Sequence, residues 1–167
     1  KSFQALSITP YRIYLNNRKI LQGFYRSLGL SDDRSMQAIT IVDKLDKIGV
    51  EGVRKELTAS LGMDGASVER ILHALTLRAD VDSAERVLTS LEVNDEMFQS
   101  GVREILEVLR LLPPSVHPVI ELDLSLARGL AYYTGLVFEV RLPDFPQFGS
   151  ASGGGRYENL TGEFMKQ

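Results

Sequence analysis

Arginine, adjacent tyrosines and glycines lie together in residues 127–135, which read ARGLAYYTG. The planar guanidinium of Arg128, beside a glycine that lets the backbone approach closely, suits a phosphate or carboxylate ligand. If the segment is extended, Tyr132 and Tyr133 point to opposite sides, so one ring can line a pocket while the other packs in the core. A hairpin connection with a surface arginine and two core tyrosines is the competing interpretation.

A second stretch, residues 149–157, is rich in glycine and reads GSASGGGRY. The run Gly153, Gly154 and Gly155 exposes its backbone, which is useful where a ligand lies flat against a strand. The stretch lacks the Gly-Lys-Ser/Thr of a P-loop and the Gly-x-Gly-x-x-Gly dinucleotide fingerprint. Alone it would be interpreted as a flexible turn. Because the two stretches lie on neighbouring strand patterns, both can face one cleft.

The elements that must position these residues are strands. Alternation of apolar and polar residues predicts strands near residues 10–15, 120–124 and 136–142. The first is followed by apolar residues at helical spacing, and Gly29 is the expected C-terminal cap of that helix. The sequence therefore predicts antiparallel strands at both ends of the chain.

Between these strands, residues 31–112 predict only helices, each apolar on one side. Gly49 and Gly52 separate two of them, Ser67 is a possible N-cap for the helix that follows it, and Pro113 ends the last one. Such short helices are stable only when packed on one another. The fold class is thus α+β, an antiparallel sheet interrupted by an all-helical insertion, with segments 1–31, 32–112 and 113–167.

Composition excludes several classes of protein. The 167 residues are 44% hydrophobic and 25% charged, as in globular domains, with no cysteine, two histidines and a net charge of −3. Thiol catalysis, disulfides and a multi-histidine metal site are therefore not expected, and no metal ligand is assigned. No apolar run approaches the roughly 18 residues of a transmembrane helix. Since the chain begins at Lys1 and stops at Gln167, we expect a segment of a longer protein.

Residues 128–135, with GGRY at 154–157, resemble the paired histidine-specific signatures of the histidyl-tRNA synthetase family, which are class II aminoacyl-tRNA synthetases. The resemblance extends to YRIYLNNRKIL at 11–21 and to VDKLDKIG at 42–49, and it covers essentially the whole chain. DLSLARGL at 123–130 and YYTGLVFE at 132–139 are similar to the eukaryote-like branch. The resemblance implies the antiparallel sheet of a class II catalytic domain with a helical insertion.

The resemblance also implies an activity. The family condenses histidine with ATP, in the presence of Mg²⁺, to histidyl-adenylate, and then transfers histidine to tRNA(His). Arg128 matches the arginine that contacts the histidine carboxylate and the α-phosphate, which is a suitable task for a fixed cation. Tyr133 matches the tyrosine that reads the imidazole, Tyr157 matches a second tyrosine beside it, and residues 153–155 match the backbone floor of the pocket. Tyr132 belongs to the same histidine-binding set, mainly as a packing partner.

One position departs from the family pattern, and several family features lie outside this sequence. Ala131 stands where the family usually has aspartate, which bears on a supporting interaction rather than on Arg128. Motifs 1, 2 and 3 of the class and the anticodon-binding domain are not found. We therefore expect these 167 residues alone to be inactive and a full-length parent to be a cytoplasmic homodimer without membrane association.

The helical insertion resembles the module that clamps the acceptor stem of the tRNA. Its candidate phosphate contacts are Lys44, Lys47, Arg54 and Lys55. Acidic residues are interleaved with these cations, so a solvated face of mixed charge is the competing interpretation.

Two alternatives to the ligase remain open at this stage. The first is a synthetase-like regulatory subunit of ATP phosphoribosyltransferase, which would sense histidine without activating it. Arg128, the tyrosines and the long helical insertion favour the enzyme, whereas Ala131 favours the regulator. The second alternative is that the segment is a structural domain with no ligand of its own.

Overall fold

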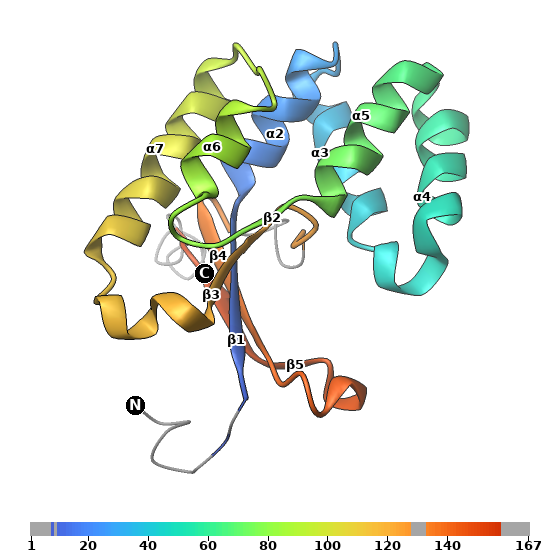
Figure 1. Ribbon diagram of the computed structural model, residues 1–167. Helices are drawn as coiled ribbons and strands as arrows, with labels where there is room; N and C mark the ends of the chain where they lie inside the picture. Colours follow the sequence, from blue (N-terminus) through green and yellow to red (C-terminus); the bar gives the residue numbers. More distant parts are fainter. Residues whose placement is uncertain (1–7, 9, 128–132, 158–167) are drawn as a thin grey trace, which may run out of the picture.

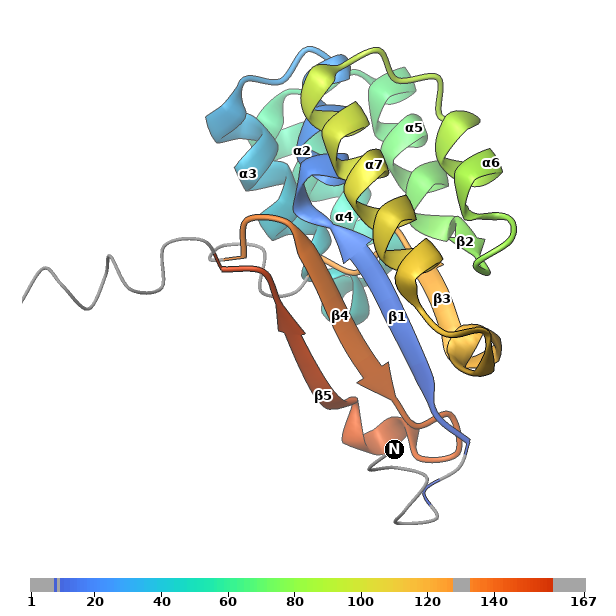
Figure 2. The same cartoon turned by 90° about the vertical axis from the view of Figure 1, so that its left-hand side faces the viewer.

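A computed structural model describes residue 8, residues 10–127 and residues 133–157 of the chain. Within them, a layer of helices covers a five-stranded sheet (Figure 1). The view turned by 90° shows the strands side by side, with one long helix crossing in front of them (Figure 2).

The sheet has the strand order β2-β3-β1-β4-β5. Its strands are β1 (Arg12–Asn17), β2 (Arg78–Ala79), β3 (Ile120–Asp123), β4 (Leu136–Arg141) and β5 (Ser150–Gly155). Three of the pairings are antiparallel, as predicted, but β1 and β3 are parallel. A parallel pair requires a long crossover connection, and the helices between β1 and β3 provide it. The α+β class is confirmed, with one parallel pair that alternation alone does not reveal.

The helices occur where their apolar periodicity predicts them. They are α2 (Arg18–Ser27), α3 (Asp32–Val42), α4 (Leu45–Leu61), α5 (Gly65–Thr76), α6 (Ala84–Thr89) and α7 (Glu96–Leu111), with short 3-10 turns at η1 (Pro114–Val119) and η2 (Pro146–Phe148). Gly29 has a φ of 86° just beyond α2, so the predicted glycine cap is confirmed. Gly49 has a φ of 68° within α4 and produces the predicted break.

Two local predictions are wrong. The N-cap of α5 is Asp64, whose carboxylate accepts a hydrogen bond from the Ser67 amide at 2.9 Å, so the helix begins earlier than the Ser67 cap would require. The range 31–112 is also not entirely helical, because Arg78 and Ala79 pair with Asp123 and Leu122. A two-residue strand is too short to show a period of two, and only its partner in the sheet makes it visible.

One hydrophobic core joins the helices to the sheet. It includes Phe24 and Tyr25 of α2, Ile105 of α7 and Leu122 of β3, all with at most 2% of their surface exposed. Packing of α7 on α2, β1 and β4 brings the helical range directly against the first segment. The division of the chain at 31/32 and 112/113 stays a prediction.

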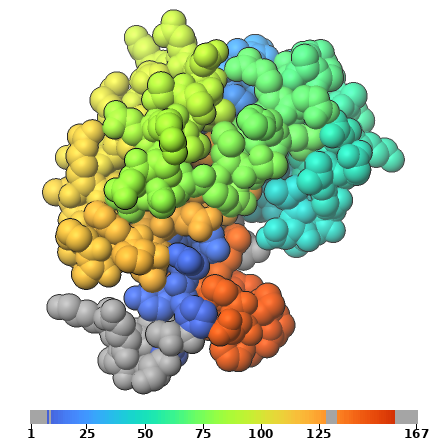
Figure 3. All heavy atoms as spheres, viewed as in Figure 1, coloured from blue at the N-terminus to red at the C-terminus, as the bar shows by residue number. Residues whose placement is uncertain are grey.

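The hairpin that joins β4 to β5 extends away from this core. In the space-filling view it stands out below the helices (Figure 3). At its tip Phe145 and Phe148 are exposed, and their ring centroids lie 6.1 Å apart. In the part of the chain that the structure describes, none of the helices combines the length and apolar character needed to cross a bilayer.

Candidate functional site

The structure describes some of the predicted site residues but not all of them. Arg128 and Tyr132 lie outside the described residues. Tyr133 and Tyr157 are both half-buried and lie at the ends of paired segments, next to β4 and β5. Gly153, Gly154 and Gly155 form the last half of the edge strand β5 rather than a turn. The two sequence stretches therefore meet along one edge of the sheet.

Main-chain hydrogen bonds hold the two stretches together. The Thr134 amide donates to the Arg156 carbonyl at 2.8 Å, and the Arg156 amide donates to the Leu136 carbonyl at 2.8 Å. Arg18, at the start of α2, also binds residues 133–135: its guanidinium donates to the Tyr133 carbonyl at 2.9 Å. Its amide donates to the Gly135 carbonyl at 3.0 Å. The main chain on both sides of Thr134 is thus anchored.

The three glycines of β5 have different surroundings. A Cβ atom on Gly155 would lie 2.6 Å from Cγ of Tyr133 and 2.8 Å from the Leu136 carbonyl oxygen, so only glycine fits under this ring. A Cβ atom on Gly154 would lie 2.9 Å from the ring of Phe138, on the other face of the strand. Gly153 is exposed, and its Cβ atom would meet the Phe138 carbonyl at 3.2 Å. Their place as the floor of a histidine pocket stays a prediction.

Buried charges lie on the sheet face that carries Gly155 and Tyr133. Asp123 of β3 is fully buried and Glu139 of β4 is 5% exposed. Arg141 donates to Glu139 at 3.0 Å, and its guanidinium lies 4.8 Å from the ring centroid of Tyr14. Buried charges persist only when they are paired, so this face is a network rather than a set of independent side chains.

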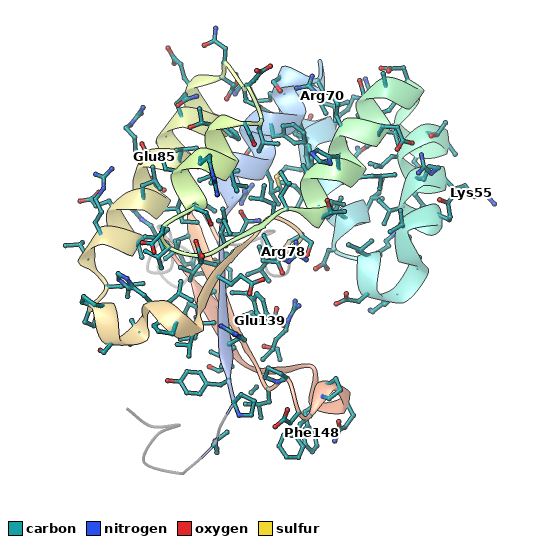
Figure 4. All side chains as sticks on the ribbon, in the orientation of Figure 1. Lys55, Arg70, Arg78, Glu85, Glu139 and Phe148 are labelled. Atoms are coloured by element: carbon teal, nitrogen blue, oxygen red, sulfur yellow. The ribbon has the colours of Figure 1, made fainter. Side chains whose placement is uncertain are left out.

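Asp123 is the centre of this network. Its Oδ1 accepts hydrogen bonds from the Ser125 amide at 2.8 Å and the Ser125 hydroxyl at 2.6 Å, and it forms an ion pair with Nη1 of Arg78 at 2.9 Å. Its Oδ2 has no hydrogen-bond partner among the described residues, and Nη1 of Arg141 lies 4.0 Å away. Arg78 belongs to β2, at the junction between the helical layer and the sheet (Figure 4).

The charges on this face also determine the ionisation of Arg141. Burial opposes its positive charge, but the hydrogen bond and charge of Glu139, together with the charges of Asp123 and Asp46, raise the pKa of Arg141 above its ordinary value. Arg141, Glu139 and Asp46 line a hollow of about 20 Å³ that Ala127 also borders. Ala127 directly precedes Arg128 in the sequence, so the network borders the last described residue before the predicted catalytic arginine.

A second cluster lies on the opposite face, beneath α7. Glu104 accepts hydrogen bonds from Lys19 at 2.5 Å and from Asn17 at 2.8 Å, and Arg156 lies 3.9 Å away. Burial of Glu104 opposes its ionisation, but these hydrogen bonds and the charges of Lys19 and Arg156 lower the pKa of Glu104 below its ordinary value. The cluster joins α7 and the start of α2 to the residue that precedes Tyr157.

The candidate tRNA cations have separate environments. Lys44 donates to Glu56 at 2.8 Å, and Arg54 is paired with both Glu51 and Glu69. Lys47 and Lys55 are exposed, and Lys55 points away from α4 (Figure 4). Ion pairing of Lys44 and Arg54 agrees with the mixed-charge interpretation for these two residues, which leaves Lys47 and Lys55 as the better candidates.

Sequence reasoning missed Asp123, Glu139, Arg141 and Arg78. The alternation placed the first three on the polar side of their strands, which is ordinarily the solvated side. A signal was nevertheless present, because acidic and basic residues occupy the same face of strands that flank the ARGLAYYTG segment. Among the described residues, no group of three or more His, Cys, Asp or Glu side chains is arranged to hold a metal ion.

Comparison with known proteins shows the family of this chain. The sequence profile of the histidyl-tRNA synthetase family matches residues 1–167. A histidine–tRNA ligase of Clostridium tetani is 34% identical over 169 residues, which cover 100% of this chain and 38% of that protein. One from Stenotrophomonas maltophilia is 40% identical over 172 residues, covering 98% of this chain and 37% of that protein. The chain therefore spans less than two-fifths of the length of these relatives.

Solved structures have the same fold. The crystal structure of histidyl-tRNA synthetase from Nostoc sp. PCC 7120 aligns with a TM-score of 0.82 at 32% identity, covering 99% of this chain and 39% of that one. A protein from Bacillus halodurans, described as an ATP phosphoribosyltransferase regulatory subunit/histidyl-tRNA synthetase, aligns with a TM-score of 0.74, covering 98% of this chain and 41% of that one. At 18% identity, this second likeness shows the fold alone. With a profile match over its full length and relatives above 30% identity, this chain belongs to the histidyl-tRNA synthetase family.

Proposed function

We propose that this chain is the part of a histidine–tRNA ligase that binds histidine and contributes the arginine for its activation by ATP. The observation that carries the proposal is the meeting of residues 133–136 with residues 153–157 along one sheet edge, beside a face of buried, paired charges. The curated relatives above 30% identity are histidine–tRNA ligases, which supports the same reaction for a full-length protein containing this chain.

In the proposed reaction, a carboxylate oxygen of histidine attacks the α-phosphorus of ATP. The bond from that phosphorus to the bridging oxygen of the β-phosphate breaks, and pyrophosphate leaves. We propose that Arg128 contacts the carboxylate and the α-phosphate, because a planar guanidinium binds two oxygens at once and stabilises the charge that develops on phosphorus. A ribose hydroxyl at the end of the tRNA then attacks the carbonyl carbon of the adenylate, the bond from that carbon to the phosphate oxygen breaks, and AMP leaves.

We propose that Tyr133 and Tyr157 recognise the imidazole. The contacts of Tyr133 support this role: Gly155 packs against its ring, and the Arg18 guanidinium donates a hydrogen bond to its carbonyl. A hydroxyl at a fixed position discriminates strongly against ligands that lack its hydrogen-bond partner, because a buried polar group is then left unpaired. Tyr132 is retained as a packing partner in this set.

Other parts of the proposal rest on the family resemblance. Mg²⁺ is proposed to accompany ATP, and no described residue is assigned to bind it. The helical range 32–112 is proposed to contact the acceptor stem of tRNA(His), with Lys47 and Lys55 as its phosphate contacts. For the full-length protein we propose a cytoplasmic homodimer, whereas these 167 residues alone are proposed to lack aminoacylation activity.

The test is histidine-dependent ATP–pyrophosphate exchange by the full-length protein. We expect Arg128→Ala to lower the exchange kcat by about 100-fold or more, since it removes a charge that stabilises the transition state. Arg103→Ala, which removes an exposed arginine from α7, is the matched control and should leave the rate unchanged. Tyr133→Phe should instead lower kcat/KM for histidine by about 10-fold or more.

The outcomes separate the ligase from the regulatory subunit. A folded full-length protein that binds histidine and shows no exchange would overturn the ligase proposal in favour of the sensor. Exchange that persists in Arg128→Ala would leave the ligase standing and remove the role assigned to this arginine.

A further inference from the structure

The segment that leads from β3 to residue 128 is held by side chains from distant parts of the chain. Asp123 and Ser125 form a local turn, closed by the Leu126 amide, which donates to the Asp123 carbonyl at 3.1 Å. From β1, the buried amide of Asn16 donates to the Leu126 carbonyl at 3.0 Å. The turn is therefore fixed from the sheet and by its own side chains up to the residues that precede Arg128.

A third support comes from the helical range. Nη2 of Arg78 donates to the Ser125 hydroxyl at 2.9 Å, and Nη1 lies 2.9 Å from the Asp123 carboxylate. The same Nη1 donates to the carbonyls of Leu75 and Leu77, at 3.0 Å and 2.9 Å, where α5 ends. One guanidinium thus joins the last turn of α5 to the turn before Arg128.

The charge of Arg78 is needed where it lies. Asp123 is fully buried, and a buried carboxylate that loses its cation is strongly destabilised. The second cation near Asp123, Arg141, is 4.0 Å away and is itself paired with Glu139. Removal of Arg78 would leave the Asp123 carboxylate, which accepts the Ser125 amide, without its closest cation. It would also remove the hydrogen bond that Arg78 donates to the Ser125 hydroxyl.

We propose that Arg78 is a positioning residue for adenylate formation, which couples the helical range to the segment bearing Arg128. The proposal rests on the proposed ligase function. It assigns Arg78 no contact with substrate: Arg78 acts by keeping residues 123–127 at a fixed place, because small displacements of a catalytic group lower rates by large factors.

The first experiment uses this 167-residue chain and measures amide hydrogen exchange. We expect Arg78→Ala to raise exchange at the Ser125 and Leu126 amides by about 10-fold or more, because local opening of the turn becomes easier. Arg103→Ala should leave both amides as they are, and amides in the middle of α7 serve as a reference for global unfolding. Equal acceleration at α7 and in the turn, or no acceleration in the turn, would overturn the positioning role.

The second experiment uses the full-length protein and normalises exchange kinetics to the number of active sites, determined from the adenylate burst. We expect Arg78→Ala to lower kcat per active site by about 10-fold or more, with KM for histidine and ATP changed less than kcat. Arg78→Lys should be intermediate, because an ammonium restores the charge but not the paired donors of the guanidinium. A merely structural role would reduce the burst and leave the rate per site unchanged.

A double-mutant cycle isolates the contact. If Arg78 acts through Asp123, Arg78→Ala combined with Asp123→Asn should be no slower than the slower single variant. Additive losses would overturn the proposed route. Absence of exchange in the unmodified protein would instead contradict the ligase function itself, so failure of the two proposals can be distinguished.

Discussion

The two faces of the sheet differ in chemistry. The face toward α7 carries apolar side chains such as Leu15, Leu122 and Leu136, and its charged cluster lies at one end around Glu104. The opposite face carries Asp123 and Glu139, which are buried although they are charged. The first face gains stability from area removed from water, whereas the second must pair every charge to avoid a desolvation cost.

We propose that this difference separates the part of the sheet that maintains the fold from the part that supports chemistry. Apolar packing would stabilise the second face at least as well, because buried ion pairs are seldom better than hydrophobic substitutes. What a paired network provides is fixed orientation of polar groups. The network borders Ala127 and lies on the sheet face that carries Gly155 and Tyr133, where the proposed function requires fixed orientation.

The largest effect is expected on the apolar face. Leu122→Ala should lower the free energy of unfolding by about 3 kcal/mol, because Leu122 is 2% exposed and its truncation leaves a cavity between β3 and the helices. Urea denaturation of the chain measures the loss. Leu111→Ala is the same chemical change at a residue that is 77% exposed, and a comparable loss there would contradict the assignment of the core.

A smaller effect should distinguish the two faces within a single strand. Gly155→Ala should cost about 2 kcal/mol, because its Cβ meets both the Tyr133 ring and the Leu136 carbonyl, and the backbone cannot move freely. Gly154→Ala should cost about 1 kcal/mol or less, since the part-exposed Phe138 ring can rotate away. Equal unfolding free energies for the two variants would contradict the packing of Tyr133 on Gly155.

The charged cluster beneath α7 should respond to pH. Because the pKa of Glu104 is lower in the folded chain than when unfolded, its stabilisation is present at neutral pH and is lost as pH falls below its ordinary value of 4.5. Glu104→Gln should therefore cost about 1 kcal/mol at pH 7 and progressively less toward pH 4. Urea denaturation from pH 7 to pH 4 measures the free energies of unfolding of the variant and the unmodified chain, which should converge as pH falls. A difference that stays constant with pH would exclude the ion pairs of Glu104 as its cause.

The smallest effect is expected on the outer surface of α4. Lys55→Ala should change the free energy of unfolding by less than about 0.5 kcal/mol, since the side chain is exposed and points away from the helix. Thermal denaturation measures this change. Lys44→Ala is a contrasting variant, because it removes the contact with Glu56, and it should be at least as destabilising as Lys55→Ala.

Most elements of the fold could be predicted, and for a local reason. The helix α2 with its glycine cap, the break at Gly49 and the strands β1, β3 and β4 follow from periodicities and turn residues that act over a few positions. The cap at Asp64 was missed because Ser67 offers a similar side chain three residues later. The strand β2 was missed because two residues are too few to show the alternation of apolar and polar side chains that indicates a strand.

Less of the candidate site could be predicted. The ARGLAYYTG and GGRY stretches pointed to two residues that lie in contact, Tyr133 and Gly155, and to segments joined by the hydrogen bond from Thr134 to Arg156. Nothing local identified Asp123 or Glu139 as buried, because an acidic residue on the polar side of a strand is ordinarily solvated. Burial of these residues depends on which helices cover that face.

The sequence by itself determined the family, the α+β class and the two stretches that bear the predicted substrate contacts, because these depend on residue types at short spacing. Only the tertiary structure decided that β1 and β3 run parallel, that β2 brings Arg78 to Asp123, and that Asp123 and Glu139 are buried on the polar side of the sheet. These features join residues more than forty positions apart, as Arg78 and Ser125 are. Their proximity is the result of packing the whole core, which no local pattern contains.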